Sequence, residues 1–140
     1  MFAWLGLWAI GAAPAMINYN LTGKALIHCL KVSGASLLLV DGDPTLVRRI
    51  EDVRSQIEQN LGMQISVLDQ QVMKEIRSQK AERPGDIYRE VVQGDWPMAM
   101  FYTSGTTGMP KGVPFQMVRC FPGGASVNTP LFEINIPVQL

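Results

Sequence analysis

The sequence has few residues that could form disulfides or bind metal ions, and it has no excess of charge of either sign. Its 140 residues include two cysteines, Cys29 and Cys120, and one histidine, His28, which is too few for a disulfide framework or a Cys/His metal centre. Lysine plus arginine and aspartate plus glutamate both number 12, so the formal net charge is zero. A nucleic-acid binder would show a basic excess, and this balance argues against one. Cys29 lies in an apolar helical pattern, so we interpret it as a reduced core thiol and weakly favour a cytosolic setting.

Charged side chains are absent from residues 1–23. The apolar run over residues 1–17 lacks the basic start of a signal peptide, and its length is at the lower limit for a membrane-spanning helix. Gly6, Gly11 and Pro14 divide it into shorter pieces. We therefore predict a buried helix over residues 2–10 and a buried strand over residues 15–19, with a small membrane-anchored module as the alternative.

The rest of the chain alternates between helical and strand patterns. Apolar spacing and capping residues predict helices over residues 22–32 and 44–61, with Thr22 and Asp43 as N-caps. A shorter helix is predicted after Asp69, with its inward face formed by Val72, Met73 and Ile76. Strands are predicted over residues 35–40, 64–68 and 98–102, the first of them covered on both faces.

This order predicts an α/β fold with a mostly parallel sheet and helices on both faces. Residues 77–95 are polar and form the loosest part, a surface excursion before the last predicted strand. His28 stands alone in its helix without other potential ligands nearby, so we assign it no chemistry.

The segment that carries chemistry follows the strand over residues 98–102. Residues 103–112 combine glycines, hydroxyl side chains and Lys111. Glycine lets backbone N–H groups approach an anion closely, while hydroxyls and an ammonium group pair with phosphate oxygens. We predict that residues 103–111 form a tight, glycine-bearing phosphate loop directly after the strand.

Two common nucleotide loops do not fit this segment. A Walker A loop that starts at Gly105 would need glycine where Pro110 stands and a hydroxyl where Gly112 stands. A dinucleotide-binding G-x-G-x-x-G loop would need glycine where Thr107 stands. The alternative without a ligand is a Gly/Thr-rich hairpin or linker.

Residues 102–112, Tyr-Thr-Ser-Gly-Thr-Thr-Gly-Met-Pro-Lys-Gly, resemble without a break the phosphate-loop signature of the adenylate-forming (AMP-binding) enzymes. That superfamily includes acyl-CoA synthetases, peptide-synthetase adenylation domains and luciferases. A narrower resemblance points to the fatty acid transport protein branch, the very-long-chain acyl-CoA synthetases. It rests on short pieces between residues 4 and 41, namely Trp4-Leu5-Gly6-Leu7, Ile17-Asn18-Tyr19-Asn20, His28-Cys29, Ser33-Gly34-Ala35 and Leu37-Leu38-Leu39-Val40-Asp41.

The resemblance implies ATP, Mg²⁺ and coenzyme A as cofactors and a fatty acid as substrate. It also implies that the pyrophosphate end of ATP is bound by Tyr102, Thr103, Ser104, Gly105, Thr106, Thr107, Gly108, Met109, Pro110 and Lys111. The implied activity is ATP-dependent fatty acid–CoA ligation through an acyl-adenylate, with a role in fatty acid uptake. The implied location is intracellular, with membrane association at the endoplasmic reticulum, peroxisome or plasma membrane left open.

The resemblance further implies that the chain is an incomplete portion of the family's large N-terminal domain. We expect a partial AMP-binding domain over residues 1–112 and an irregular tail over residues 113–140, with no complete catalytic set. The chain alone is then expected to be inactive, with sheet edges and one sheet face exposed. A catalytically inactive remnant or a partner-binding fragment of such an enzyme is the alternative, and no oligomeric state is indicated.

Overall fold

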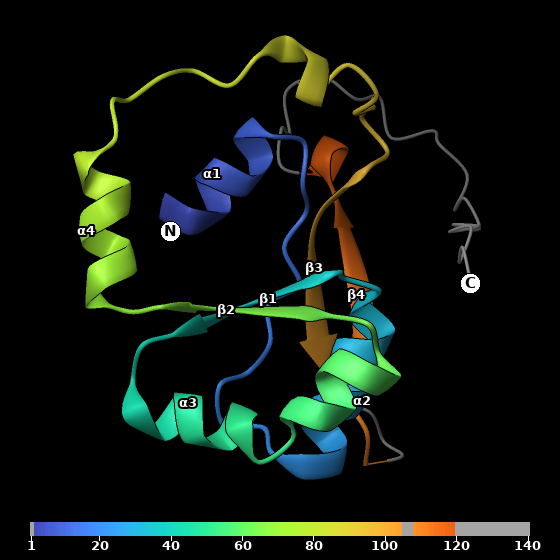
Figure 1. The fold of residues 1–140 in the computed structure, drawn as a ribbon. Helices are drawn as coiled ribbons and strands as arrows, with labels where there is room; N and C mark the ends of the chain where they lie inside the picture. The colour runs from blue at the N-terminus through green and yellow to red at the C-terminus, as the bar shows by residue number, and fades with distance from the viewer. Residues whose placement is uncertain (1, 105–107, 120–140) are drawn as a thin grey trace.

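The computed structural model describes residues 2–104 and 108–119 (Figure 1). Helices and strands alternate over residues 23–103, so the predicted α/β class is confirmed. In order they are α1 (Phe2–Ala9), α2 (Gly23–Ser33), β1 (Leu37–Asp41), α3 (Pro44–Glu51), the π-helical turn η1 (Gln56–Asn60), β2 (Gln64–Leu68), α4 (Gln70–Ser78), the 3₁₀ turn η2 (Asp86–Tyr88), β3 (Pro97–Thr103), β4 (Lys111–Gln116) and the 3₁₀ turn η3 (Met117–Arg119).

The described strands form two separate pairs. β1 and β2 are parallel, with Leu37 opposite Gln64. β3 and β4 are antiparallel, with Thr103 opposite Lys111. The predicted mostly parallel sheet is therefore not confirmed among the described strands. The physical reason is the short connection over residues 104–110, because a parallel crossover needs about a dozen residues or more.

The strand β4 corrects the predicted start of the irregular tail at residue 113. β4 continues to Gln116, and η3 follows it directly. Gly112 and Pro114 hide this strand in the sequence, since both residues are unfavourable inside a sheet. Proline is tolerated here because β4 pairs with β3 alone among the described strands, which leaves its other edge without a ladder. The rest of the predicted tail, residues 120–140, lies outside the described residues.

The predicted strand over residues 15–19 is also corrected, because only one bridge forms there. Ala15 pairs in parallel with Met100 of β3, through hydrogen bonds from Met16 N to Met100 O (2.8 Å) and from Met100 N to Pro14 O (2.9 Å). A turn at Asn18 then redirects the chain, since Leu21 N donates to Asn18 O at 3.0 Å. The segment still lies beside β3 and attaches the N-terminal part of the chain to the hairpin.

Capping residues place two of the helix starts as predicted. The Asp43 carboxylate accepts hydrogen bonds from the N–H groups of Thr45 and Leu46, which hold its pKa below the usual range. The Asp69 carboxylate accepts one from Val72 N at 2.8 Å. Thr22 occupies the N-cap position of α2 with an extended backbone, but its side chain makes no capping hydrogen bond.

Two helix predictions need correction. The helix predicted over residues 44–61 is interrupted, because α3 ends at Glu51 and the π-helical turn η1 begins at Gln56. Across the interruption Ile50, Val53 and Ile57 all remain buried. In α4, Ile76 does not face inward as predicted, since 55% of it is exposed. An amphipathic spacing predicts a side to bury, but burial requires a neighbouring element on that side.

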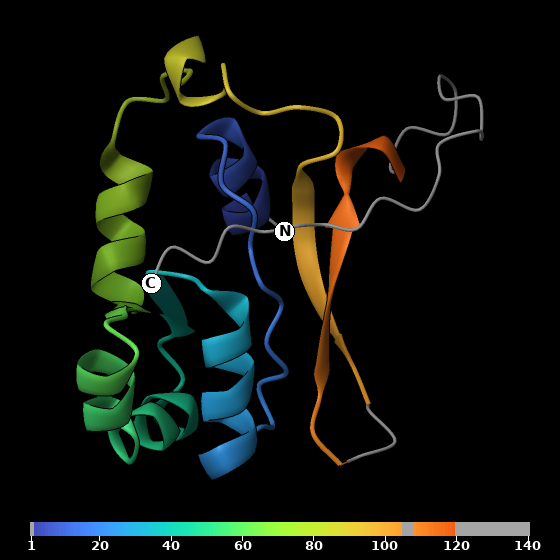
Figure 2. The same cartoon turned by 90° about the vertical axis from the view of Figure 1, so that its right-hand side faces the viewer.

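The main core lies where α2, α3 and η1 meet the parallel strand pair. Its buried members come from α2, β1, α3 and the segment that follows α3, namely Leu26, Leu30, Val40, Ile50, Val53, Ile57 and Met63. α2 contacts η1 on one side and β4 on the other, so it lies between the core and the hairpin (Figure 2).

The sequence predicted that the first strand is covered on both faces, but the side of β1 that faces away from the core is not covered. Leu37 and Leu39 are 45% and 37% exposed, while Val40 on the inner side is buried. The expectation that one sheet face would be exposed is therefore confirmed for the described residues.

Helix α1 ends in a Schellman motif. Gly11 adopts a left-handed backbone (φ 72°), Gly11 N donates to Trp8 O at 3.0 Å, and Ala12 N donates to Leu7 O at 2.9 Å. The helix is attached to β3 through the Trp8 indole, whose Nε1–H donates to Met98 O at 2.7 Å. None of the described helices combines the length and apolar character that a membrane-spanning helix requires.

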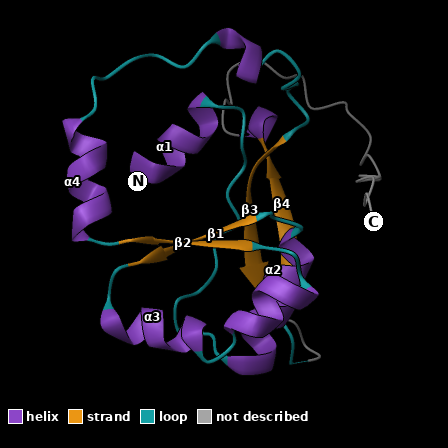
Figure 3. Cartoon of the chain, viewed as in Figure 1, coloured by secondary structure: helices purple, strands orange, loops and turns teal. Residues whose placement is uncertain are grey.

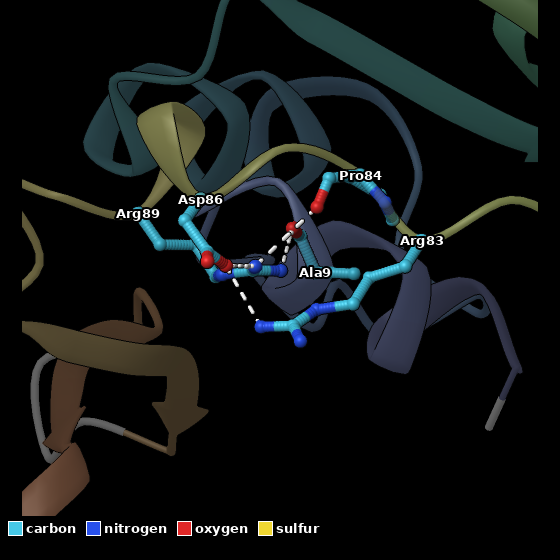
Figure 4. A network of polar contacts seen from close by, with 5 residues as sticks. All are labelled: Ala9, Arg83, Pro84, Asp86 and Arg89. Atoms are coloured by element: carbon cyan, nitrogen blue, oxygen red, sulfur yellow. Dashed lines mark hydrogen bonds and ion pairs between the residues drawn. The ribbon is translucent and has the colours of Figure 1, made fainter.

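The segment between α4 and β3 is largely loop, as predicted for residues 77–95 (Figure 3). It is anchored at Arg89, whose guanidinium donates to Ala9 O at 2.7 Å and forms an ion pair with Asp86 (Figure 4). Arg83 pairs with the same carboxylate from a more exposed position (Figure 4). A cation at the last carbonyls of a helix is favourable, because those carbonyls have no partner within the helix.

Replacing Arg89 with alanine should release this segment without unfolding the core. We expect faster hydrogen–deuterium exchange over residues 79–95 and a loss of about 1 kcal/mol in the free energy of unfolding, since a half-buried donor to a helix end is removed. The Arg83→Ala variant is the control, because its side chain is 77% exposed and its ion pair should contribute little. Equal exchange in both variants would contradict the anchoring role of Arg89.

Candidate functional site

The β3–β4 hairpin positions the predicted loop. Thr103 is the last residue of β3, Lys111 is the first of β4, and the two are opposite each other in the ladder. The loop therefore begins and ends on paired backbone, which brings its two stems side by side. The sequence analysis placed the loop after a strand of the parallel sheet, whereas it connects the two strands of an antiparallel hairpin.

The structure describes most of the predicted site residues. Thr103, Ser104 and Lys111 are exposed, and Gly108 adopts the left-handed backbone (φ 85°) that a glycine-bearing turn requires. Pro110 and Tyr102 are half-buried at the two stems, and Met109 is 36% exposed. The predicted ligands Gly105, Thr106 and Thr107 lie outside the described residues.

Helix α2 contacts both stems of the loop. The Tyr102 hydroxyl donates to Cys29 O at 2.7 Å, and His28 Nε2 lies 3.0 Å from Pro110 O. Burial raises the pKa of Tyr102 to about 12, so this hydroxyl keeps its proton at neutral pH. Burial also raises the pKa of the Cys29 thiol, which supports its interpretation as a reduced core residue.

Sequence reasoning missed the role of His28. The contact joins residues 82 positions apart in the chain, and nothing in the local pattern around His28 points to it. The signal exists only in the fold, where α2 lies against the start of β4.

A small pocket of about 350 Å³ lies at this contact between α2 and the loop. It is lined by His28, Val32, Met109, Pro110, Lys111 and Gly112. A side chain at Gly112 would approach Val32 Cγ1 to 2.9 Å and Met100 Sδ to 3.0 Å, so glycine allows α2 to pack closely on β4. Lys111 makes no ion pair with another described residue, which leaves its ammonium group available to an anion.

A larger pocket of about 560 Å³ lies at the carboxyl ends of β1 and β2, where parallel sheets usually bind ligands. Its carboxylates are already used by the backbone: Asp41 accepts from Asp43 N at 3.0 Å, and Asp43 and Asp69 cap helices. We therefore assign the candidate site to the hairpin, where the described hydroxyls of Thr103 and Ser104 and the ammonium group of Lys111 have no comparable structural partners among the described residues. Across residues 2–104 and 108–119, no cluster of His, Cys, Asp and Glu side chains is suited to hold a metal ion.

The fold and the hairpin agree with the comparison to known families. The AMP-binding enzyme family model matches residues 1–119, so the chain belongs to the AMP-binding enzyme family. This match includes β4 and η3, beyond the domain end expected at residue 112.

The curated relatives that the chain matches carry different names. The chain is 34% identical over 125 residues to isopenicillin N epimerase component 1 of Hapsidospora chrysogena, covering 89% of this chain and 15% of the relative. It is 37% identical over 113 residues to the very long-chain fatty acid transport protein of Cochliobolus heterostrophus, covering 81% and 17%. The corresponding protein of Saccharomyces cerevisiae is 36% identical over 117 residues, covering 79% and 17%. The chain thus spans less than a fifth of the length of these relatives.

Solved structures show the same fold. A fatty acyl CoA synthetase of Mycobacterium tuberculosis aligns with a TM-score of 0.63 at 23% identity, over 81% of this chain and 21% of that protein. A long-chain-fatty-acid-CoA ligase of Archaeoglobus fulgidus aligns with a TM-score of 0.60 at 24% identity, over 82% and 22%. The aligned part of this chain thus corresponds to about a fifth of each of these proteins.

Proposed function

We propose that the chain supplies the phosphate-binding hairpin of an ATP-dependent fatty acid–CoA ligase of the fatty acid transport protein branch. The observation that carries this proposal is the gathering of Thr103, Ser104 and Lys111 at one end of the β3–β4 hairpin, next to the left-handed Gly108. Family membership and the very long-chain fatty acid transport proteins among the relatives support the fatty acyl subclass.

In the proposed reaction, a carboxylate oxygen of the fatty acid attacks the α-phosphorus of ATP. The bond to the bridging oxygen breaks, pyrophosphate leaves, and an acyl-adenylate remains. The thiol of coenzyme A then attacks the acyl carbonyl, and AMP leaves with the electron pair of the broken bond. The hairpin would bind the pyrophosphate end, where hydroxyls and Lys111 stabilise negative charge as the bond breaks. Mg²⁺ would accompany the phosphates as part of the nucleotide substrate.

Replacing Lys111 with alanine tests this role. We expect the affinity of the chain for Mg·ATP and for pyrophosphate, measured by isothermal titration calorimetry, to fall about fivefold to tenfold, because an exposed charge-assisted contact to phosphate is lost. The Lys74→Ala variant is the matched control, since Lys74 is an exposed lysine that lines the pocket at the ends of β1 and β2. A loss of affinity in Lys74→Ala, with none in Lys111→Ala, would place the nucleotide in that other pocket and refute the proposal.

An inactive fragment that retains phosphate binding is the second candidate, and the observation that favours it is the small share of each relative that the chain spans. Catalysis requires two substrates and a metal around one phosphorus, and one hairpin supplies only part of that arrangement. We therefore expect binding of ATP without formation of acyl-CoA when the chain is given ATP, Mg²⁺, coenzyme A and a long-chain fatty acid. Acyl-CoA and AMP released at a steady rate would contradict this second candidate and support a working ligase.

A further inference from the structure

We propose that two consecutive residues of α2, His28 and Cys29, clamp the two stems of the phosphate loop and that His28 is a positioning residue for the site. The proposal rests on the proposed function, since it concerns how the same hairpin is held. One stem is held by the hydrogen bond from the Tyr102 hydroxyl to Cys29 O, and the other by the contact between His28 Nε2 and Pro110 O.

The His28 contact fixes which ring nitrogen carries the proton. A carbonyl oxygen only accepts hydrogen bonds, so a 3.0 Å approach to Pro110 O requires Nε2–H on the imidazole. The same N–H is present in the neutral Nε2–H tautomer and in the imidazolium, so the contact survives protonation of the ring. The clamp is therefore a geometric device and does not depend on His28 carrying a charge.

The position of Pro110 explains why this contact reaches the site. Its carbonyl belongs to the peptide group that leads into Lys111. The donor from α2 therefore sets the orientation of the peptide plane directly before the lysine. On the other stem, Tyr102 immediately precedes Thr103, the first hydroxyl residue of the loop.

The close packing of α2 on β4 makes the clamp stiff. Val32, one turn after His28, lies against Gly112 so closely that a single added carbon would clash with it at 2.9 Å. Along α2, His28 and Cys29 thus contact the two loop stems, and Val32 contacts Gly112, the second residue of β4. Fixing the stems before ligand arrives removes part of the ordering cost that binding would otherwise carry.

The test compares two replacements of His28 in the full chain, with inorganic pyrophosphate as the probe. In His28→Leu the donor is lost, and we expect pyrophosphate affinity to fall about threefold to tenfold. In His28→Gln the side-chain amide places an N–H near the position of Nε2, and we expect affinity within about twofold of the original chain. Tyr102→Phe removes the other half of the clamp and should weaken binding to a similar degree as His28→Leu.

The comparison of leucine with glutamine separates positioning from packing. If glutamine binds pyrophosphate as weakly as leucine, or if leucine binds it as well as histidine, the proposal is overturned. Nitrogen-15 NMR of His28 provides an independent readout, because the clamp requires a proton on Nε2. A neutral ring that carries its proton on Nδ1 would overturn the proposal as well. Thermal unfolding of each variant checks that the fold is retained.

Failure of the clamp can be told apart from failure of the proposed function. If no variant binds pyrophosphate, including the unchanged chain, the proposed function is refuted, and amide NMR shifts of Gly108 and Lys111 then decide the clamp without ligand. Shifts that change in His28→Leu and return in His28→Gln support it. Shifts that stay constant in both variants overturn it.

Discussion

Replacing Ile57 with alanine is expected to lower the free energy of unfolding by about 3–4 kcal/mol, measured by urea denaturation. Ile57 is 0% exposed and belongs to the core cluster with Leu30 of α2 and Met63 before β2. Truncation removes apolar contacts and leaves a cavity at the point where η1 meets α2. Surrounding residues from three elements cannot all move inward to fill it, so the cost should lie well above that of an average substitution.

The matched control is Ile76→Ala, the same replacement on α4. Because 55% of Ile76 is exposed, its loss should change the free energy of unfolding by no more than about 0.5 kcal/mol. Equal effects at the two positions would mean that the core does not lie where α2 and η1 meet. A large effect at Ile76 would show that its predicted inward orientation describes the protein in solution.

The features that could be predicted from the sequence are those whose physical cause is local. Asp43 and Asp69 were identified as caps because the N–H groups that they accept from lie within the next three residues. Strand β2 was placed with its observed bounds, because its apolar run ends at the Asp69 cap. The candidate loop was recognised in the same way, because its glycines, hydroxyls and lysine are contiguous in the chain, and its phosphate-binding role stays a prediction.

The features that were missed depend on contacts between distant segments. The antiparallel direction of β4 follows from a short connection, but Gly112 and Pro114 conceal that a strand follows the loop at all. The contact of His28 with Pro110 requires α2 to be docked on the hairpin, which no local pattern encodes. Ile76 shows the converse, because its helical spacing is correct and the element that would bury it is not present among the described residues.

The second large effect is expected at Gly11, where alanine should lower the free energy of unfolding by about 3 kcal/mol. Two causes act together at this position. The left-handed backbone of Gly11 (φ 72°) costs a residue with a Cβ about 1–2 kcal/mol. A Cβ built on Gly11 would also lie 2.2 Å from the carbonyl oxygen of Tyr88, which is a backbone atom and cannot rotate away.

Gly34→Ala isolates the first cause from the second. Gly34 ends α2 with a similar left-handed backbone (φ 61°), and a Cβ there would meet nothing within 4 Å, so it should lose only about 1 kcal/mol. The excess loss at Gly11 then measures how firmly the segment around Tyr88 is held against the end of α1. If that segment gives way to relieve the clash, hydrogen exchange over residues 79–95 should rise in Gly11→Ala and stay unchanged in Gly34→Ala. Equal losses and equal exchange in the two variants would mean that Tyr88 does not pack on Gly11, and would also remove the support for Arg89 as the anchor of this segment.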